Sequence, residues 1–325
     1  MITVEHLSKA YAGTPVVADV SFTCEPGTVT GFLGPNGAGK STTLRMITGL
    51  TRPNAGHSTV LGRPYPKLPN PARLVGTLLD ASAMHPGRTG RATLEIAADI
   101  IGVPHSRVGE VLEQVGLHGK AGDRRVGAYS LGMRQRLGIG QALLGDPQLL
   151  ILDEPANGLD PEGIAWMRVL LRDFADRGGV VLLSSHLLAE VEATVDRLVV
   201  INGGKIVAQG ELSELLSTPG LVVRAIDQPA LASALRYAAI PFTDPRDGTF
   251  AVDTTTGVTA EAVARAATAS DVLVVELRHA DRRGLEELFF DLTGPAPHSV
   301  HPETGHPLLA PLPTQTRTDL QGVSR

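Results

Sequence analysis

The sequence has few of the features that would place a protein in a membrane or outside the cell. Its single cysteine, Cys24, cannot form an internal disulfide and fits a reducing compartment. No apolar run approaches the roughly 18 residues that a membrane-spanning helix requires. The first residues lack the basic head and apolar core of a signal peptide, so we expect none. If the protein serves a membrane process, another chain must cross the bilayer.

The charge balance also argues against broad classes of function. The formal net charge is −5, so no global basic field favours nucleic acid. We find no heptad run and no internal repeat. The hydrophobic content of 42% and the charged content of 19% are ordinary for a soluble globular protein, and 325 residues can hold about two domains.

The most informative stretch is Gly34-Pro35-Asn36-Gly37-Ala38-Gly39-Lys40-Ser41. It fits the pattern Gly-x-x-x-x-Gly-Lys-Ser/Thr, and it lies between a β-branched apolar run at 29–33 and a helix-like run at 42–50. Its glycines allow a tight turn that directs several N–H groups at one anion, at the positive end of a helix. We expect Lys40 to reach the β- and γ-phosphates of a nucleotide and Ser41 to bind Mg²⁺. The alternative is an ordinary glycine-rich turn in a chain with 36 glycines.

A second motif ends the apolar run at 148–152 with the pair Asp153-Glu154. A carboxylate just past a buried strand, in a chain with a phosphate loop, lies where Mg²⁺ is held. We assign that role to Asp153, acting through water. Glu154 is then the candidate general base for the attacking water. The alternative is a solvated acidic pair at a strand end.

The surrounding pattern predicts an α/β core with an inserted helical subdomain at about 81–146. Within that stretch three segments have helical spacing, with no strand-like run between them: 93–101, 107–115 and 132–144. A smaller α+β unit is expected from 218 to 293. Its predicted strands are 221–226, 249–252 and 272–277, and its predicted helices are 229–238, 260–268 and 284–292. The tail at 294–325 is rich in proline and polar residues and is predicted to be disordered.

The third motif is the segment from Tyr129 to Leu137, which contains Ser130 and Gly132. This segment resembles the signature Leu-Ser-Gly-Gly-Gln of the ABC (ATP-binding cassette) transporter ATPases, although Tyr129, Leu131 and Met133 depart from it. Ser130 can cap a helix whose N–H groups face an anion, and Gly132 allows close approach. The resemblance implies that the anion is the γ-phosphate held by the opposite subunit of a head-to-tail dimer. The alternative is a capped structural helix.

The remaining motifs follow the order of that family. The stretch 157–160 resembles the loop that crosses between subunits, and His186 resembles the switch histidine that contacts the γ-phosphate. Tyr11 matches the aromatic residue that stacks on adenine. Asp80 stands where family members usually carry a glutamine that touches Mg²⁺ and the attacking water. The alternatives are a structural histidine and a tyrosine that merely packs beside the first strands.

The resemblance implies a P-loop NTPase cassette at 1–217 that hydrolyses ATP with Mg²⁺. A second ATPase subunit, most simply another copy, and a separate transmembrane permease are the implied partners, and no nucleic acid is expected. The implied location is the cytoplasmic face of the membrane. The form of the signature and the ending at 284–294 resemble the drug- and antibiotic-export branch, similar to daunorubicin-resistance ATPases. The alternatives are a soluble cassette ATPase that acts on ribosomes or nucleic acid, and a regulator that does not hydrolyse ATP.

These motifs define the expected site by role. The expected catalytic residues are Glu154, His186 and Lys40. The expected metal ligands are Ser41, Asp153 and Asp80. The expected nucleotide-binding residues are Tyr11, Gly34, Pro35, Asn36, Gly37, Ala38, Gly39, Lys40, Ser41, Thr42, Ser130 and Gly132.

Overall fold

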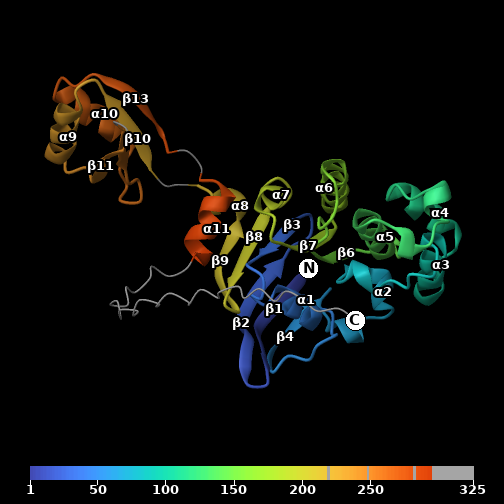
Figure 1. Cartoon of the computed structure of the whole chain (residues 1–325). Coiled ribbons are helices and arrows are strands. Elements are labelled where there is room, and N and C mark those ends of the chain that lie inside the picture. Colours follow the sequence, from blue (N-terminus) through green and yellow to red (C-terminus); the bar gives the residue numbers. More distant parts are fainter. Residues whose placement is uncertain (218–219, 247–248, 281–282, 295–325) are drawn as a thin grey trace, which may run out of the picture. The chain divides into compact units, whose positions relative to one another are not determined.

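The computed structural model describes residues 1–217, 220–246, 249–280 and 283–294, and its elements are labelled in Figure 1. The described residues belong to one compact unit that ends at Gly294. The tail predicted to be disordered therefore lies, apart from its first residue, outside the described residues. Within the described part, no helix combines the length and the apolarity needed to cross a bilayer.

The central element is a six-stranded sheet in the order β5-β6-β7-β3-β8-β9. The first five strands in that order run parallel, and β9 pairs with β8 antiparallel at the edge. In sheet order the strands are β5 (Val75–Leu78), β6 (Leu149–Asp153), β7 (Val180–Ser185), β3 (Val29–Leu33), β8 (Arg197–Asn202) and β9 (Lys205–Glu211). The apolar runs predicted at 29–33 and 148–152 thus form β3 and β6, which are buried on both faces of the sheet.

Side-chain alternation along β6 divides the core between the two faces of this sheet. Leu149 and Ile151 pack in one cluster with the phosphate-loop helix α1 (Lys40–Ile47). Leu150 and Leu152 pack in the other, with α6 (Pro161–Asp176) and the helical subdomain. The first cluster also takes in an antiparallel sheet in the order β2-β1-β4, formed by β1 (Ile2–Tyr11), β2 (Thr14–Cys24) and β4 (Ala55–Val60). Cys24 lies in this cluster as a free thiol, and burial raises its pKa to about 12.

The three helices expected between β5 and β6 are confirmed, and they pack on one another. They are α3 (Gly90–Ile101), α4 (Ser106–Gln114) and α5 (Leu131–Leu143). The sequence pattern had not indicated five short turns of helix in this part of the chain. They are η1 (Tyr65–Lys67) and α2 (Pro71–Leu74) between β4 and β5, η2 (Ala81–Ala83) between β5 and α3, and η3 (Gly119–Ala121) and η4 (Val126–Ala128) between α4 and α5. The observed class is the predicted one, an α/β core with an inserted helical subdomain.

A separate four-stranded antiparallel sheet with two helices has its own apolar cluster. Its elements in chain order are β10 (Leu221–Ala225), α9 (Gln228–Tyr237), β11 (Phe242–Arg246), β12 (Thr249–Val252), α10 (Ala260–Ala269) and β13 (Val274–His279). The strand order β11-β12-β10-β13 with this βαββαβ sequence is the ferredoxin-like arrangement. The sequence had not indicated β11, because Pro245 interrupts its pattern. Proline is tolerated there because β11 is an edge strand.

The last helix packs differently from the sequence expectation. We expected a helix at 284–292 to complete the α+β unit, and α11 (Leu285–Thr293) does form. Leu285 and Leu288, however, are buried in the cluster that covers the parallel sheet, and α11 packs on α7 (Leu188–Glu192) and β8. The Leu285 N–H donates to a Glu192 carboxylate oxygen at 3.2 Å. We therefore propose that the α+β unit ends before α11, which belongs with the cassette core together with α8 (Leu212–Leu215).

Candidate nucleotide-binding and hydrolysis site

The phosphate loop joins the end of β3 to the start of α1, as the motif requires. A Cβ atom at Gly34 would lie 2.3 Å from the Ile201 carbonyl oxygen. Gly39 has φ 104°, and a Cβ atom there would lie 2.7 Å from the Val16 carbonyl oxygen. Only glycine fits both positions. No side chain caps α1, so its first N–H groups are available to a phosphate.

Lys40, at the first position of α1, is almost fully buried. Its ammonium donates to the Gly34 carbonyl oxygen at 2.7 Å and lies 3.6 Å from Glu154 Oε1. A buried ammonium requires such partners because desolvation penalises an unpaired charge. The loop and the end of β6 are therefore joined by the lysine that the sequence assigned to the phosphates.

Glu154, just past β6, has an unusual backbone conformation. Its φ of 50° lies in the left-handed region, which is unfavourable for a residue other than glycine. Its N–H donates to the Ser184 carbonyl oxygen at 3.2 Å and to Ser184 Oγ at 3.1 Å. The Ser184 hydroxyl in turn donates to Asp153 Oδ1. Ser184 on β7 thus fixes the two neighbouring acidic residues in one network.

The carboxylate of Glu154 is held between two side chains. Oε1 faces Lys40, while Oε2 lies 2.7 Å from His186 Nδ1. His186 follows the end of β7 and its side chain is 42% exposed, whereas that of Glu154 is 23% exposed. The structure therefore brings together all three residues predicted to be catalytic. An acceptor held in this way, partly open to solvent, can take a proton from a water molecule.

The metal-binding expectation can be tested on the donor atoms alone. Asp153 commits one carboxylate oxygen to Ser184, which leaves the other for a cation. Ser41 follows Lys40 in the first turn of α1. One carboxylate and one hydroxyl fit Mg²⁺, which usually takes its other ligands from water and substrate phosphates. Among the described residues, no group of three or more His, Cys, Asp or Glu side chains could hold a metal ion by itself.

Asp80 is engaged elsewhere. It lies at the N-cap of η2, where its carboxylate accepts from the Ser82 N–H at 2.8 Å and from the Ser82 hydroxyl at 2.6 Å. These hydrogen bonds, led by that from the hydroxyl, lower the pKa of Asp80. The residue is exposed and ionised, and its carboxylate hydrogen bonds come from Ser82 rather than from Ser41 or a group near Asp153. Its metal role stays a prediction.

Tyr11 ends β1 with its ring half exposed. The Lys9 ammonium lies 5.1 Å from the ring centroid, within range of a cation–π contact. An exposed aromatic face at this place is compatible with stacking on a base. Its role in adenine binding stays a prediction.

The signature segment starts α5 as expected. The Ser130 hydroxyl accepts from the Met133 N–H at 3.2 Å, which confirms the predicted cap. Gly132 has a structural reason within the chain: a Cβ atom there would lie 2.8 Å from the Gly158 carbonyl oxygen. Gly158 has φ 77°, and a Cβ atom there would lie 2.4 Å from Leu131 Cγ. The start of α5 and the loop at 157–160 therefore pack so closely that neither glycine could carry a side chain without a shift of its neighbours.

Two residues of the site were not singled out from the sequence. Ser184 lies on β7, the strand that pairs with the end of β6, and a hydroxyl there beside Asp153 could have suggested the link. Gln135 is buried in α5, and its Nε2 donates to the Glu154 carbonyl oxygen at 2.8 Å. No sequence signal pointed to that contact, because it joins separate elements.

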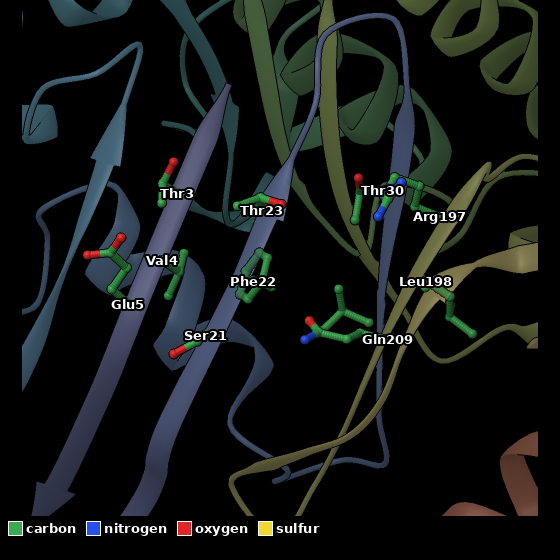
Figure 2. Close-up of a pocket in the computed structure, with 12 residues that line it drawn as sticks. Thr3, Val4, Glu5, Ser21, Phe22, Thr23, Thr30, Arg197, Leu198 and Gln209 are labelled. Atoms are coloured by element: carbon green, nitrogen blue, oxygen red, sulfur yellow. The ribbon is translucent and has the colours of Figure 1, made fainter.

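A hollow of about 390 Å³ lies away from this site, between the strands β1 and β2 and the strands β3, β8 and β9. Figure 2 shows its wall, with the Arg197, Gln209 and Thr30 side chains opposite those of Phe22 and Thr23. It contains no residue of the phosphate loop and none of the acidic pair. It is therefore distinct from the nucleotide site.

The comparisons with known proteins agree with this geometry. The sequence profile of the family described as "ABC transporter" matches residues 17–157. An uncharacterised ABC transporter ATP-binding protein, YhcH of Bacillus subtilis, is 38% identical over 239 residues, which cover 72% of this chain and 78% of YhcH. The chain belongs to the ABC transporter ATP-binding proteins. It is accordingly an ATPase subunit of the ABC class.

Other relatives of this ABC subunit support the same assignment. The bacitracin transport ATP-binding protein BcrA of Bacillus licheniformis is 41% identical over 212 residues, which cover 64% of this chain and 69% of BcrA. A solved ATP-binding subunit of an ABC transporter is 30% identical, with a TM-score of 0.61 over 66% of this chain and 91% of that chain. A dimeric ATP-binding cassette bound to ADP and Pi has a TM-score of 0.59 over 65% of this chain and 99% of that chain. At 20% identity the last likeness shows the fold alone.

Proposed function

We propose that this ABC subunit hydrolyses ATP to drive the export of an antibiotic, a drug or another hydrophobic compound through a separate transmembrane permease. The observation that carries the proposal is the arrangement of Glu154 between Lys40 and His186, beside the phosphate loop. The relative BcrA, which is named for bacitracin transport, supports the choice of cargo. The nature of the exported compound rests on that likeness, and the permease is the expected place of its recognition.

Each residue of the site has a defined task in the proposed reaction. The N–H groups of the phosphate loop and Lys40 bind the phosphates of ATP and stabilise the charge that develops during transfer. Glu154 takes the proton of the attacking water. His186, hydrogen-bonded to Glu154, can orient that carboxylate and contact the γ-phosphate. When bound between Ser41 and Asp153, Mg²⁺ would supply further neutralisation of phosphate charge.

The proposed working form is a head-to-tail dimer of two copies of this chain. ABC ATP-binding subunits pair, and the neighbour bound to ADP and Pi is described as dimeric. In such a pair, Ser130 and Gly132 of one copy would complete the nucleotide site of the other. The exposed position of Ser130 at the start of a capped helix is compatible with this role. The identity of the two subunits is part of the proposal.

The proposed permease contact lies on the helical subdomain. A hollow of about 330 Å³ there is lined in part by Asp80, Met84, His85 and Ile96, with Ile100 beside them. The Ile100 side chain is 76% exposed, which is high for an apolar residue. A helix of a permease could cover this surface. The subunit would then lie at the membrane as a peripheral protein on its cytoplasmic side.

The substitution Glu154→Gln tests the catalytic part of the proposal. It removes the proton acceptor while keeping the shape, so turnover of ATP should fall by about 10²–10⁴-fold while ATP still binds and pairs the subunits. ATPase rate, nucleotide affinity and dimer mass would be measured together. The matched control is Glu113→Gln on an exposed position of α4, which should leave all three unchanged. Normal turnover by Glu154→Gln would remove the residue from its assigned role.

The transport part needs a separate experiment. Tagged Glu154→Gln protein with ATP would be captured from detergent-solubilised native membranes. Recovery of a multi-span membrane protein in near-equal amount supports the permease reading and provides the channel for cargo assays. Recovery of ribosomes or nucleic acid without a membrane protein would contradict it and favour a soluble cassette ATPase.

A further inference from the structure

Both polar groups of the Glu154 backbone, its N–H and its carbonyl oxygen, form hydrogen bonds with other elements. Its N–H is bound by the carbonyl oxygen and hydroxyl of Ser184 on β7, at 3.2 Å and 3.1 Å. Its carbonyl oxygen accepts from Gln135 Nε2 on α5 at 2.8 Å. Such bonds matter because a φ of 50° is unfavourable for a glutamate and persists only where the surroundings impose it.

Gln135 is unusual among the polar residues of α5. It is only 4% exposed, and its amide leaves the helical subdomain to reach a backbone atom at the end of β6. A long polar side chain is seldom buried without a specific partner. Gln135 also lies on the helix that Ser130 starts. The signature helix and the candidate base are thereby joined by one direct hydrogen bond within the chain.

We propose that Gln135 is a positioning residue for ATP hydrolysis, which holds the Glu154 carboxylate in place through the Glu154 carbonyl group and so couples it to the signature helix. The inference rests on the proposed role of Glu154 as the base. Lys40 and His186 fix the carboxylate end, while Gln135 and Ser184 fix the backbone end. Displacement of α5 would move the Glu154 backbone as well. The state of the signature helix would therefore be transmitted to the base.

The direct test is Gln135→Met, which keeps the length of the side chain and removes its donor. The turnover number should fall by about 10–100-fold, because a base displaced by about 1 Å loses that order of rate. The affinity for ATP, measured with a fluorescent analogue, should stay within about twofold, since the Gln135 amide donates to the Glu154 carbonyl oxygen and not to the phosphate loop. The control is Gln141→Met, an exposed glutamine on the same helix, with unchanged turnover.

A double-mutant cycle distinguishes a positioning role of Gln135 from a general loss of structure. Combined with Glu154→Gln, the Gln135→Met change should cause no further loss of turnover, because residues that act as a unit are not additive. A full multiplicative loss in the double variant would overturn the inference. So would a Gln135→Met protein with normal turnover, even where Glu154→Gln is inactive. Should Glu154→Gln itself turn over normally, the proposed function fails first, and the two failures are distinguishable.

A conservative variant provides an independent readout if Gln135→Met folds poorly. Gln135→Glu keeps the shape, but an ionised carboxylate cannot donate to the Glu154 carbonyl oxygen, whereas a protonated one can. The turnover of Gln135→Glu relative to the unaltered protein should therefore rise as the pH is lowered from 8.5 to about 5.5. A flat or falling ratio would contradict a role for the donor.

Discussion

The N-termini of α1 and α5 differ in how they are capped, although both are expected to face phosphate groups of a nucleotide. α1 follows Gly39 in a left-handed conformation and has no side-chain cap. α5 is capped by the Ser130 hydroxyl, and its first turn is packed through Gly132 on the Gly158 carbonyl group. At α1 the first N–H groups are all left to a ligand, whereas at α5 one of them, the Met133 N–H, already donates to Ser130 Oγ.

In the proposed dimer, this difference would give the two halves of the nucleotide site different degrees of order before they meet. The phosphate loop has no side-chain cap at the start of α1, so its N–H donors are available to a nucleotide phosphate. The signature end keeps its shape without a partner, because a cap and a close glycine contact hold it. A preformed second half loses little freedom when it meets the nucleotide of another copy. The predictions below test each start in turn.

The largest effect is expected at α1 with Lys40→Met. The change removes the only charge that the phosphate motif contributes and leaves Glu154 Oε1 without its buried cation. Turnover should fall by at least ~10²–10³-fold, as for the loss of one preorganised donor to a developing charge. ATPase rate and nucleotide affinity would be measured beside Lys67→Met, an exposed lysine in η1. Retention of turnover by Lys40→Met would contradict the phosphate-binding role assigned to the start of α1.

A smaller effect is expected at α5 with Ser130→Ala. Loss of the cap should lower the free energy of unfolding by about 0.5–2 kcal/mol. Turnover should fall about tenfold or more, since a hydrogen bond to a charged group is worth ~1.5–3 kcal/mol. The matched variant is Thr89→Ala, which removes the equivalent cap of α3, where Thr89 Oγ1 accepts from the Ala92 N–H.

Thermal unfolding and ATPase rate of the two cap variants would be compared. Both should lose similar stability, and only Ser130→Ala should lose turnover. Equal retention of turnover would mean that Ser130 is only a structural cap. In that case α5 would be an ordinary capped helix, and only the N-terminus of α1 would have a role in ATP hydrolysis.

The sequence predicted the parts of the molecule whose pattern is local. The phosphate loop, the apolar run of β6 and the cap at Ser130 each combine a short motif with the periodicity of one element, so the strands and helices around them were predicted. The ferredoxin-like unit was predicted only in part. Pro245 hides the edge strand β11, since a proline within a run usually argues against a strand.

Contacts between distant elements could not be predicted in the same way. The apolar face of α11 fits the sequence equally well on the α+β unit or on the cassette, and tertiary packing decides for the latter. The bond from Gln135 to Glu154 joins two elements that a linear pattern does not relate. The left-handed φ of Glu154 is likewise imposed by its surroundings, because intrinsic preference disfavours it.

A third helix start, that of η2, should respond least. Asp80 caps η2 with a carboxylate, and hydrogen bonds from Ser82 lower its pKa. A group whose pKa is lowered on folding stabilises the fold above its unfolded pKa and loses that effect only as the pH falls through the folded value. Asp80 is therefore ionised throughout a neutral assay. Any effect of Asp80→Asn at that pH reports the loss of its charge.

Asparagine is as good a cap as aspartate, so Asp80→Asn should keep the stability of the fold. If the charge acts on the metal, the Mg²⁺ concentration for half-maximal turnover should rise by up to about fivefold, as for the loss of an exposed charge worth ~0–1 kcal/mol. A Mg²⁺ titration of ATPase activity measures this directly. An unchanged titration would confine Asp80 to capping η2. The phosphate-loop residue Ser41 and Asp153 would then remain as the expected metal ligands.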